Sequence, residues 1–390
     1  MEGPSRAAGD RADGPGRPPQ GPARQVTLPA QKSAAKAEAQ RLLAHLRALG
    51  AEEVEAAILQ PAEELLDLYG EDIRARAFVT QDPLRGEMML RPDFTVPVVR
   101  MHMEAGLDPA RYAYAGEVFR RQEADDPLRP SEFLQVGFEL FGGRDPADAD
   151  AEVFVSLASA LSDLHLRAAM GDIGLILAAV DGLSTTPMRK AALRRHVWRP
   201  RRFRALLDRF AGRIPVSEER AALLALADPL ADAGPEIGVR TRAEIEARLQ
   251  QLRDEALAPP LPGEELALID ALLSLAAPVP SALDTLRTLE QDAPGIGPAI
   301  YRLERRVEAL ERRGIDLADV TFEGSFGRTT LEYYDGFVFG LFAAARPELP
   351  PVATGGRYDA LTRVLGQGRV VPAVGGVIRP ELVAQLRGGA

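Results

Sequence analysis

The residues whose types and spacing suggest a chemical site lie in segment 111–142, RYAYAGEVFRRQEADDPLRPSEFLQVGFELFG. It consists of two alternating stretches joined by a charged loop that contains proline. Because alternate residues of a β-strand lie on the same face, the second stretch has an apolar and a polar face. The apolar face comprises Leu134, Val136, Phe138 and Leu140, and the other comprises Phe133, Gln135, Gly137 and Glu139. A glycine between an amide and a carboxylate indicates that something approaches the backbone closely there.

The first stretch has a matching pattern, in which one face carries Tyr112, Tyr114, Gly116, Val118 and Arg120. Two such stretches predict an antiparallel hairpin. We expect its polar face to bring Arg120, Gln135 and Glu139 close together. An arginine, an amide and a carboxylate at one place offer hydrogen-bond donors, acceptors and both signs of charge to a small molecule.

The composition limits the kinds of site that the chain can hold. It has 390 residues, of which 46% are hydrophobic, enough for a sizeable core. The net charge of −10 argues against a basic surface for nucleic acid. There is no cysteine and the four histidines are scattered, so we expect neither a disulfide nor a structural metal site. No signal peptide or membrane helix is predicted, and a cytoplasmic protein is expected.

The elements at the start of the chain follow from periodicity and from breaking residues. Residues 1–30 are rich in Pro and Gly and predict a disordered tail. A helix is expected over 34–49, because its apolar residues have helical spacing and Gly50 follows. A strand over 54–61 and a short helix through Tyr69 come next.

A second hairpin and a helix are predicted before segment 111–142. The hairpin pairs 76–80 with 86–91 and turns at Asp82-Pro83. In the following string, LRPDFTVPVVR, Asp93 or Thr95 is expected to cap a helix that has a proline in its first turn.

A long helical segment is predicted in the second half of the chain. A helix over 148–165 and an apolar stretch over 173–180 precede it. Residues 184–313 are almost continuously helical in pattern, rich in Ala, Leu and Arg. Their basic run at 189–204 is typical of a solvated helix face and is not expected to bind nucleic acid.

The end of the chain returns to strands. VTFEGSFGRTTLEYYDGFVFGLFAA predicts a hairpin that turns near Tyr334-Asp335-Gly336, with Phe337, Phe339 and Leu341 on one face. TGGRYDALTRVLG predicts a glycine turn into a helix, and VVPAVGGVIRPELVAQL closes the chain.

Several of these strings resemble class II aminoacyl-tRNA synthetases, and in detail the histidyl-tRNA synthetase branch. The F-R strand end, the loop and the Q-x-G-x-E-x-F-G strand of segment 111–142 resemble motif 2. The helix and strand before Pro61 look like motif 1, the dimer-forming element. LRPDFT resembles the segment that holds the substrate ammonium, while LEYYDGFVF and GGRYD resemble histidine-specific elements.

The resemblance covers residues 31–387 and implies a fold. It is an α+β fold with a class II aminoacyl-tRNA synthetase-like antiparallel sheet flanked by helices and a helical insertion. The implied parts are a disordered tail (1–30), a synthetase-like domain in two pieces (31–183 and 314–390) and the insertion (184–313). A homodimer formed through motif 1 is also implied.

The departures from the synthetase pattern fall on residues that act on ATP. Forming an adenylate requires positive groups aimed at phosphates. By the resemblance, the glutamate that receives adenine is replaced by Gln122, a loop arginine by Ser131 and the motif 3 arginine by Leu382. The histidine-specific arginine falls on Thr329, although Arg328 is adjacent. The chain also ends where a synthetase would continue into an anticodon-reading domain, so neither tRNA binding nor a cofactor is expected.

The amino-acid pocket of the family is intact in the sequence. Its residues are Asp93, Thr95, Arg120, Gln135, Glu139, Tyr333 and Tyr334. They supply acids, an arginine and hydroxyls that match the ammonium, carboxylate and side chain of a free amino acid. The resemblance implies that Asp93, Thr95 and Gln135 face the ammonium of histidine. It also implies that Arg120 faces the carboxylate and that Glu139 and Tyr334 face the imidazole.

A retained pocket without activation resembles the regulatory subunits of ATP phosphoribosyltransferase, which are synthetase paralogues. That resemblance implies a non-catalytic chain that binds L-histidine and forms a hetero-octamer with the short-form catalytic subunit. Such a chain activates the catalytic subunit and mediates feedback inhibition at the first step of histidine biosynthesis. Two alternatives stay open at this point: an active or truncated histidyl-tRNA synthetase or aminoacyl transferase, and an amino-acid sensor with another partner.

Overall fold

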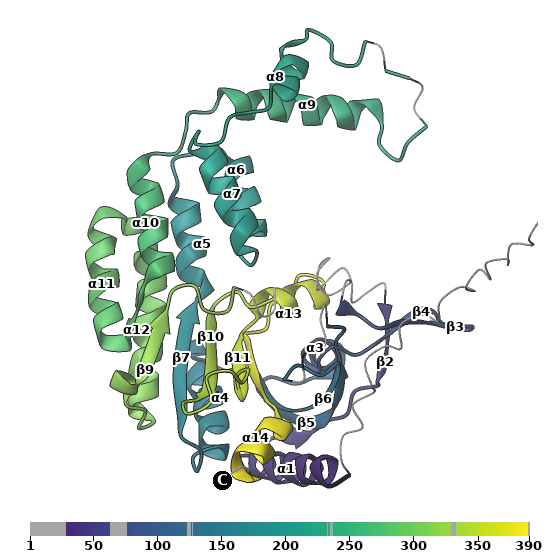
Figure 1. The fold of residues 1–390 in the computed structure, drawn as a ribbon, viewed down its shortest axis with the longest axis vertical. Coiled ribbons are helices and arrows are strands. Elements are labelled where there is room, and N and C mark those ends of the chain that lie inside the picture. Colours follow the sequence, from purple (N-terminus) through teal and green to yellow (C-terminus); the bar gives the residue numbers. More distant parts are fainter. Residues whose placement is uncertain are drawn as a thin grey trace, which may run out of the picture.

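A nine-stranded mixed sheet forms the centre of the molecule, and a column of helices rises from one end of it (Figure 1). The computed structural model describes residues 29–62, 76–122, 126, 128–231, 233–234, 237–328 and 333–388. Within these ranges no helix has the length and apolar character needed to cross a membrane.

The large sheet combines strands from the beginning, middle and end of the chain. In spatial order its strands are β1 (Glu52–Glu53), β5 (Ala110–Phe119), β6 (Glu132–Phe141), β12 (Ala373–Ile378), β11 (Ala353–Arg357), β10 (Phe337–Ala343), β7 (Leu166–Asp172), β9 (Val320–Glu323) and β8 (Ala276–Pro278). Neighbours are antiparallel except in the pairs β1–β5 and β7–β9. A small antiparallel sheet has the order β2 (Leu59–Pro61), β4 (Gly86–Leu90) and β3 (Val79–Asp82).

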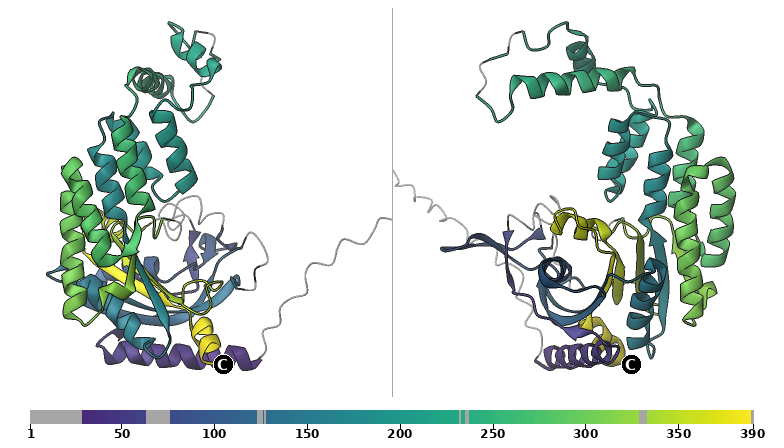
Figure 2. Two further views of the ribbon diagram at one scale, coloured as in Figure 1. Left: turned by 60° about the vertical axis from the view of Figure 1, so that its left-hand side comes forward. Right: turned by 180° about the vertical axis from the view of Figure 1, so that it is seen from behind.

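Helices cover both faces of the large sheet. On one face α1 (Pro29–Ala48) and α14 (Pro380–Gly388) pack together against β6, and α4 (Pro146–Ala160) packs on β10, β11 and β12 (Figures 1 and 2). The polar side chains of β6 point to the opposite face, where α3 (Thr95–Ala105) begins and packs against α13 (Asp359–Leu365). This second face therefore carries the candidate site.

The remaining helices lie between β7 and β9 in the chain and form the column. They are α5 (Ile173–Gly182), α6 (Pro187–Arg195), α7 (Pro200–Phe210), α8 (Glu218–Ala225), α9 (Arg242–Leu257), α10 (Gly263–Ser274), α11 (Val279–Asp292) and α12 (Gly297–Arg312), with 3-10 turns at Pro294–Ile296 and Leu317–Asp319. The pair α8 and α9 lies at the outer end of the column, far from the sheet (Figure 1).

Short-range chemistry sets several helix boundaries. The chain leaves α1 through Gly50, whose positive φ of 91° is readily accessible to glycine. Helix α4 starts at Pro146, and the Asp145 side chain accepts a hydrogen bond from the Ala147 N–H. Phe94 occupies the N-cap position of α3, and the predicted capping contact is a long one, from the Val96 N–H to Asp93 at 3.5 Å.

The hairpin predicted for segment 111–142 is confirmed. Strands β5 and β6 pair along their whole length, with Tyr112 opposite Glu139 and Gly116 opposite Gln135. The predicted apolar face is also correct, since Val136 and Phe138 are fully buried on the side of β6 that faces the packed helices. The hairpin of β3 and β4 around Asp82 is confirmed as well. Alternation predicted the first hairpin, whereas the turn at Asp82-Pro83 predicted the second.

Two predictions at the end of the chain are wrong. Strands β9 and β10 do not form a hairpin, because β7 lies between them and pairs with both. The TGGR string is not a turn but strand β11, in which Gly355 and Gly356 leave room for the Phe339 and Tyr334 rings. In both cases a partner distant in the sequence decides the local structure.

Several expectations concern the domain division. Of the predicted tail over 1–30, residues 1–28 lie outside the described residues, as does the predicted helix through Tyr69. Helix α1 begins at Pro29, one residue before the predicted end of the tail. Segment 184–313 is helical as expected but also contributes β8 to the large sheet. Its basic run is only partly solvated, because Arg189 is buried. The division at 184 and 313 stays a prediction.

A buried network of ion pairs joins the sheet to the helical segment. The Asp150 carboxylate on α4 accepts hydrogen bonds from Arg306 of α12 at 2.8 Å and from Arg357 of β11 at 2.6 and 2.9 Å. Arg306 also donates to Asp172 at 2.8 Å, and its guanidinium lies over the Phe337 ring. All four charged residues are buried. Removing one of them would leave an opposite charge in the interior without its partner.

Asp150→Ala is therefore expected to lower the free energy of unfolding by about 3–5 kcal/mol, measured by urea denaturation. The neighbouring arginine provides a matched control. Arg305 pairs with Asp145 and Glu308 at the surface, where solvent screens the charges, so Arg305→Ala should leave the free energy of unfolding nearly unchanged. Equal losses in the two variants would contradict a special role for the buried network.

Candidate functional site

A stack of side chains lines the polar face of the β5–β6 hairpin. The Arg91 guanidinium lies 3.9 Å from the centre of the Phe94 ring, and Phe94 stacks on Tyr114 with centroids 4.3 Å apart. The Tyr114 ring lies across Gly137, where a Cβ atom would be 2.1 Å from it. The close approach predicted at this glycine is thus made by a neighbouring side chain.

Glu139 is the centre of the site. Its side chain is 0% exposed and accepts hydrogen bonds from three hydroxyl groups. Thr95 Oγ1 at 2.9 Å and Tyr114 OH at 2.8 Å donate to Oε1, and Tyr358 OH donates to Oε2. Gly375 on the adjacent strand β12 leaves space for the carboxylate, since a Cβ atom there would be 1.5 Å from Oε2.

The surroundings of Glu139 set its protonation. Burial raises its pKa from 4.5 to about 7, and the negative charge of Asp93 acts in the same direction. The hydroxyls of Tyr358, Tyr114 and Thr95 oppose this rise in pKa, because they donate to the ionised form. Burial and the charge of Glu139 in turn raise the pKa of both tyrosines well above 10, so both remain donors at neutral pH. A cation beside Glu139 would favour the ionised carboxylate.

Three further predicted residues are Asp93, Gln135 and Arg120. Asp93 is 2% exposed, just before the first residue of α3. Gln135 is 1% exposed on the same face of β6 as Glu139, and no donor among the described residues reaches its Oε1. Arg120 follows β5 and donates through Nε to the Pro92 carbonyl oxygen at 2.7 Å. The backbone before α3 thereby orients the arginine.

The tyrosine pair completes the arrangement. The rings of Tyr333 and Tyr334 contact each other edge to face, with centroids 4.9 Å apart. Burial raises the pKa of Tyr334, the charges of Glu139 and Asp93 raise it further, and Arg120 lowers it. Tyr334 therefore lies within electrostatic reach of all three charged groups. Among the seven predicted residues, Thr95 contacts Glu139, Tyr333 contacts Tyr334, and the charge of Asp93 acts on both Glu139 and Tyr334. Arg120 is linked to Tyr334 through its charge, and Gln135 lies four residues from Glu139 along β6. That all seven form one site stays a prediction.

Comparison with known proteins decides the family. The sequence matches the family model for histidyl-tRNA synthetase over residues 25–256 and 241–383. ATP phosphoribosyltransferase regulatory subunits from Brucella canis and Brucella suis are each 34% identical to it over 357 residues, which cover 86% of this chain and 93% of each relative. The chain belongs to the ATP phosphoribosyltransferase regulatory subunit family. This confirms the family resemblance found in the sequence.

Solved structures have the same fold as this chain, which is a member of the regulatory subunit family. A Bacillus halodurans protein titled ATP phosphoribosyltransferase regulatory subunit/histidyl-tRNA synthetase aligns with a TM-score of 0.66 and 22% identity, covering 96% of this chain and 84% of that one. A histidine–tRNA ligase subunit from Alicyclobacillus acidocaldarius aligns with a TM-score of 0.59 and 25% identity, covering 98% and 99%. The predicted α+β fold, with its mostly antiparallel sheet flanked by helices, is confirmed.

The sequence resemblance to synthetases predicts that the residues acting on ATP there are replaced in this chain, and this correspondence stays a prediction. The residues concerned are Gln122, Ser131 and Leu382, together with Thr329, which lies outside the described residues. Leu382 is buried in α14. Arg328, the neighbouring alternative to Thr329, is buried and donates through Nε to the Val197 carbonyl oxygen at 2.7 Å. Its guanidinium therefore contacts the helical segment.

Sequence reasoning missed two donors to Glu139. Tyr114 is two residues from Tyr112, the cross-strand partner of Glu139, so the predicted register contained the signal. Tyr358 belongs to the GGRYD string, which was recognised only as a motif. It follows β11, which is separated from β6 by β12, and no spacing in the sequence predicts that contact.

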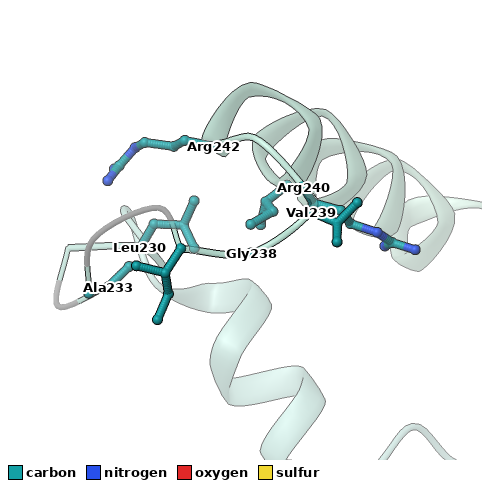
Figure 3. Close-up of a pocket in the computed structure, with 9 residues that line it drawn as sticks. Leu230, Ala233, Gly238, Val239, Arg240 and Arg242 are labelled. Carbon is teal, nitrogen blue, oxygen red and sulfur yellow. The ribbon is translucent and has the colours of Figure 1, made fainter.

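A separate hollow of ≈ 500 Å³ lies beside the loop that joins α8 to α9 (Figure 3). Its lining comprises Leu230, Ala233, Gly234, Ile237, Gly238, Val239, Arg240, Arg242 and Ile245. The described residues of this lining include two arginines, which suit an anionic group better than an ammonium. No group of His, Cys, Asp or Glu side chains in the described part of the chain is arranged to hold a metal ion.

The raised pKa of Glu139 predicts a pH-dependent stability. A carboxyl that binds its proton more tightly in the native state makes that state less stable as the pH rises from 4.5 to about 7. Glu139→Gln keeps the side-chain shape and removes the titration. The free energy of unfolding of the variant minus that of the wild type should therefore increase by a few kcal/mol across this interval. Urea unfolding at several pH values measures the difference, and a constant difference would contradict the raised pKa.

Proposed function

We propose that this chain binds free L-histidine and thereby controls a short-form ATP phosphoribosyltransferase catalytic subunit at the first step of histidine biosynthesis. The relatives are named regulatory subunits of that enzyme, which supports a catalytic partner. The observation that carries the proposal is the buried Glu139 carboxylate, held by three hydroxyl donors beside a second buried acid.

A buried site with this charge selects a cationic ligand. The negative charge of Asp93 makes ionisation of Glu139 less favourable, and burial acts in the same direction. An ammonium or imidazolium group near the two acids would offset both effects. Gln135 offers a further buried acceptor, because no described donor reaches its Oε1, and buried acceptors normally have a partner.

The three parts of histidine then have separate partners. The ammonium lies against Asp93, Thr95 and Gln135, as the family resemblance implies. The carboxylate lies at Arg120, whose planar guanidinium suits a carboxylate and is oriented by the Pro92 carbonyl. The imidazole lies against Glu139 and Tyr334. These roles carry the family pattern over to the matching residues of this chain.

The chain is also proposed to be non-catalytic. Adenylate formation places negative charge on phosphates, and an enzyme stabilises that charge with positive groups. Gln122, Ser131 and Leu382 supply none at the corresponding positions. The proposal requires no cofactor. With a net charge of −10, the chain is not expected to bind tRNA specifically, and a cytoplasmic location stays a prediction.

Regulation requires coupling between the pocket and a partner. A pocket that recognises an amino acid without activating it acts by favouring one conformational state of the assembly. For inhibition, histidine must bind the less active state more tightly, and a coupling of about 1–3 kcal/mol is typical. By resemblance, the assembly is a hetero-octamer with the catalytic subunit, and the regulatory chains pair through motif 1.

Glu139→Gln should weaken histidine binding by about ten-fold or more, because a contact with a charged group contributes about 1.5–3 kcal/mol. Isothermal titration calorimetry measures the affinity. Glu132→Gln, at the exposed end of the same strand, is the matched control and should bind histidine like the wild type. No heat of histidine binding in the wild type would refute the proposed ligand, and equal affinity in both variants would refute the proposed role of Glu139.

Adding this chain should raise the turnover of a short-form catalytic subunit, and histidine should then lower it. The assay follows phosphoribosyl-ATP formation by the catalytic subunit alone, with this chain, and with this chain plus histidine. Changing both Tyr333 and Tyr334 to Ala should abolish the response to histidine, because both rings line the pocket. The regulatory proposal fails if turnover is the same at every subunit ratio. Equal inhibition with the double variant would instead refute this pocket as the sensor.

A further inference from the structure

We infer that Trp198 is a positioning residue of the amino-acid pocket and makes the helical segment part of the histidine site. The inference rests on the proposed function, since histidine is the ligand concerned. Trp198 lies in the turn between α6 and α7, and its indole Nε1 donates to the Tyr334 carbonyl oxygen at 3.1 Å. The two residues are 136 positions apart in the sequence. This hydrogen bond joins the helical segment directly to the backbone of a pocket residue.

A second set of contacts, made by Arg328, binds the same α6–α7 turn. The Nε of Arg328 donates to the carbonyl oxygen of Val197, the residue before Trp198, at 2.7 Å. The Arg328 guanidinium also lies over the Phe203 ring of α7, 4.9 Å from its centre. Residues 328 and 334 are therefore both bound to consecutive residues of the α6–α7 turn. Together these contacts restrict the orientation of the α6–α7 turn more than a single hydrogen bond would.

The residue after Tyr334 is hydrogen-bonded to the sheet and to the start of α13. The N–H of the next residue, Asp335, donates to the Arg357 carbonyl oxygen at 3.0 Å. The Asp335 carboxylate accepts hydrogen bonds from the N–H groups of Asp359 at 3.2 Å and Ala360 at 2.6 Å, at the start of α13. Tyr334 thus lies between two supports, the sheet and the helical segment. A displacement of the α6–α7 turn relative to the sheet must move Tyr334 or break the Trp198 hydrogen bond.

Helix α6, which precedes the Trp198 turn, is also hydrogen-bonded to the outer end of the column. Arg189 on α6 is buried and donates to the carbonyl oxygens of Pro259 at 2.8 Å and Glu255 at 2.9 Å, where α9 ends. Helix α6 is therefore bound to α9 on one side and followed by the Trp198 turn on the other. Position between two sites does not by itself establish coupling, so the inference requires a measurement that responds to the contact.

The wild-type protein supplies that measurement. Trp198 is the single tryptophan of the 390-residue chain, so the tryptophan emission reports this contact without a mutation. L-histidine titrated into the wild type should change the emission in a saturable manner. The midpoint should equal the dissociation constant from calorimetry. Glycine, which lacks the imidazole, is the control ligand and should leave the emission unchanged at the same concentrations.

A substitution tests the energetic role of the hydrogen bond. Trp198→Phe keeps an aromatic ring and removes the N–H donor, and histidine binding should weaken about five-fold, the usual effect of one neutral hydrogen bond. Tyr301→Phe is the control for an aromatic substitution. Tyr301 is 63% exposed on α12, so this variant should bind histidine like the wild type. Thermal unfolding of both variants shows whether the fold is intact.

The outcomes separate this inference from the proposed function. Calorimetric histidine binding with unchanged tryptophan emission at saturation, together with wild-type affinity in Trp198→Phe, would overturn the inference and leave the proposed function standing. No histidine binding by the wild type would overturn both. If Trp198→Phe does not fold, the emission of the wild type decides the question alone.

Discussion

The buried carboxylate of Glu139 is the constraint on which the site depends. Its three donors come from the start of α3, from β5 and from the residue after β11. The order β5, β6, β12, β11 in the sheet brings these segments together. Keeping an ionised carboxylate away from water is unfavourable unless a cation or several donors compensate. In the proposed pocket three donors compensate the carboxylate in part, and a positive ligand would compensate it further.

The GGRYD string takes part both in the buried ion-pair network and in the hydrogen bonds to Glu139. Arg357 binds Asp150 and so belongs to the ion network between the sheet and α12. The next residue, Tyr358, donates to Glu139 in the pocket, and Asp359 pairs with Arg357. One short string thus contacts both the buried network and Glu139 of the proposed site. Helix α12 is linked to that string through Arg306 and Asp150, separately from the contact through Trp198.

Local patterns were enough to predict the β5–β6 hairpin and its two faces. The expected grouping of three polar residues is not seen in the register, because Glu139 lies opposite Tyr112, Gln135 opposite Gly116 and Arg120 beyond the end of β5. Local patterns also failed where pairing depends on distant segments. Strand β7 separates β9 from β10, and its sequence lies about 150 residues earlier, so alternation alone favoured a hairpin that does not exist. The glycines of TGGR favoured a turn, whereas they serve in β11 to admit aromatic rings. The role of Tyr358 could not be predicted for the same reason, because the order of the strands in the sheet decides that its partner is Glu139.

The glycines of the site have a consequence for how such a family diverges after gene duplication. Gly137 makes room for the Tyr114 ring, and Gly375 makes room for the Glu139 carboxylate. A methyl group at either position would occupy space that a neighbouring side chain already fills. A larger residue at either position would displace Tyr114 or Glu139 from its place in the site. These two glycines should therefore change more slowly in this family than the charges that act on ATP in synthetases.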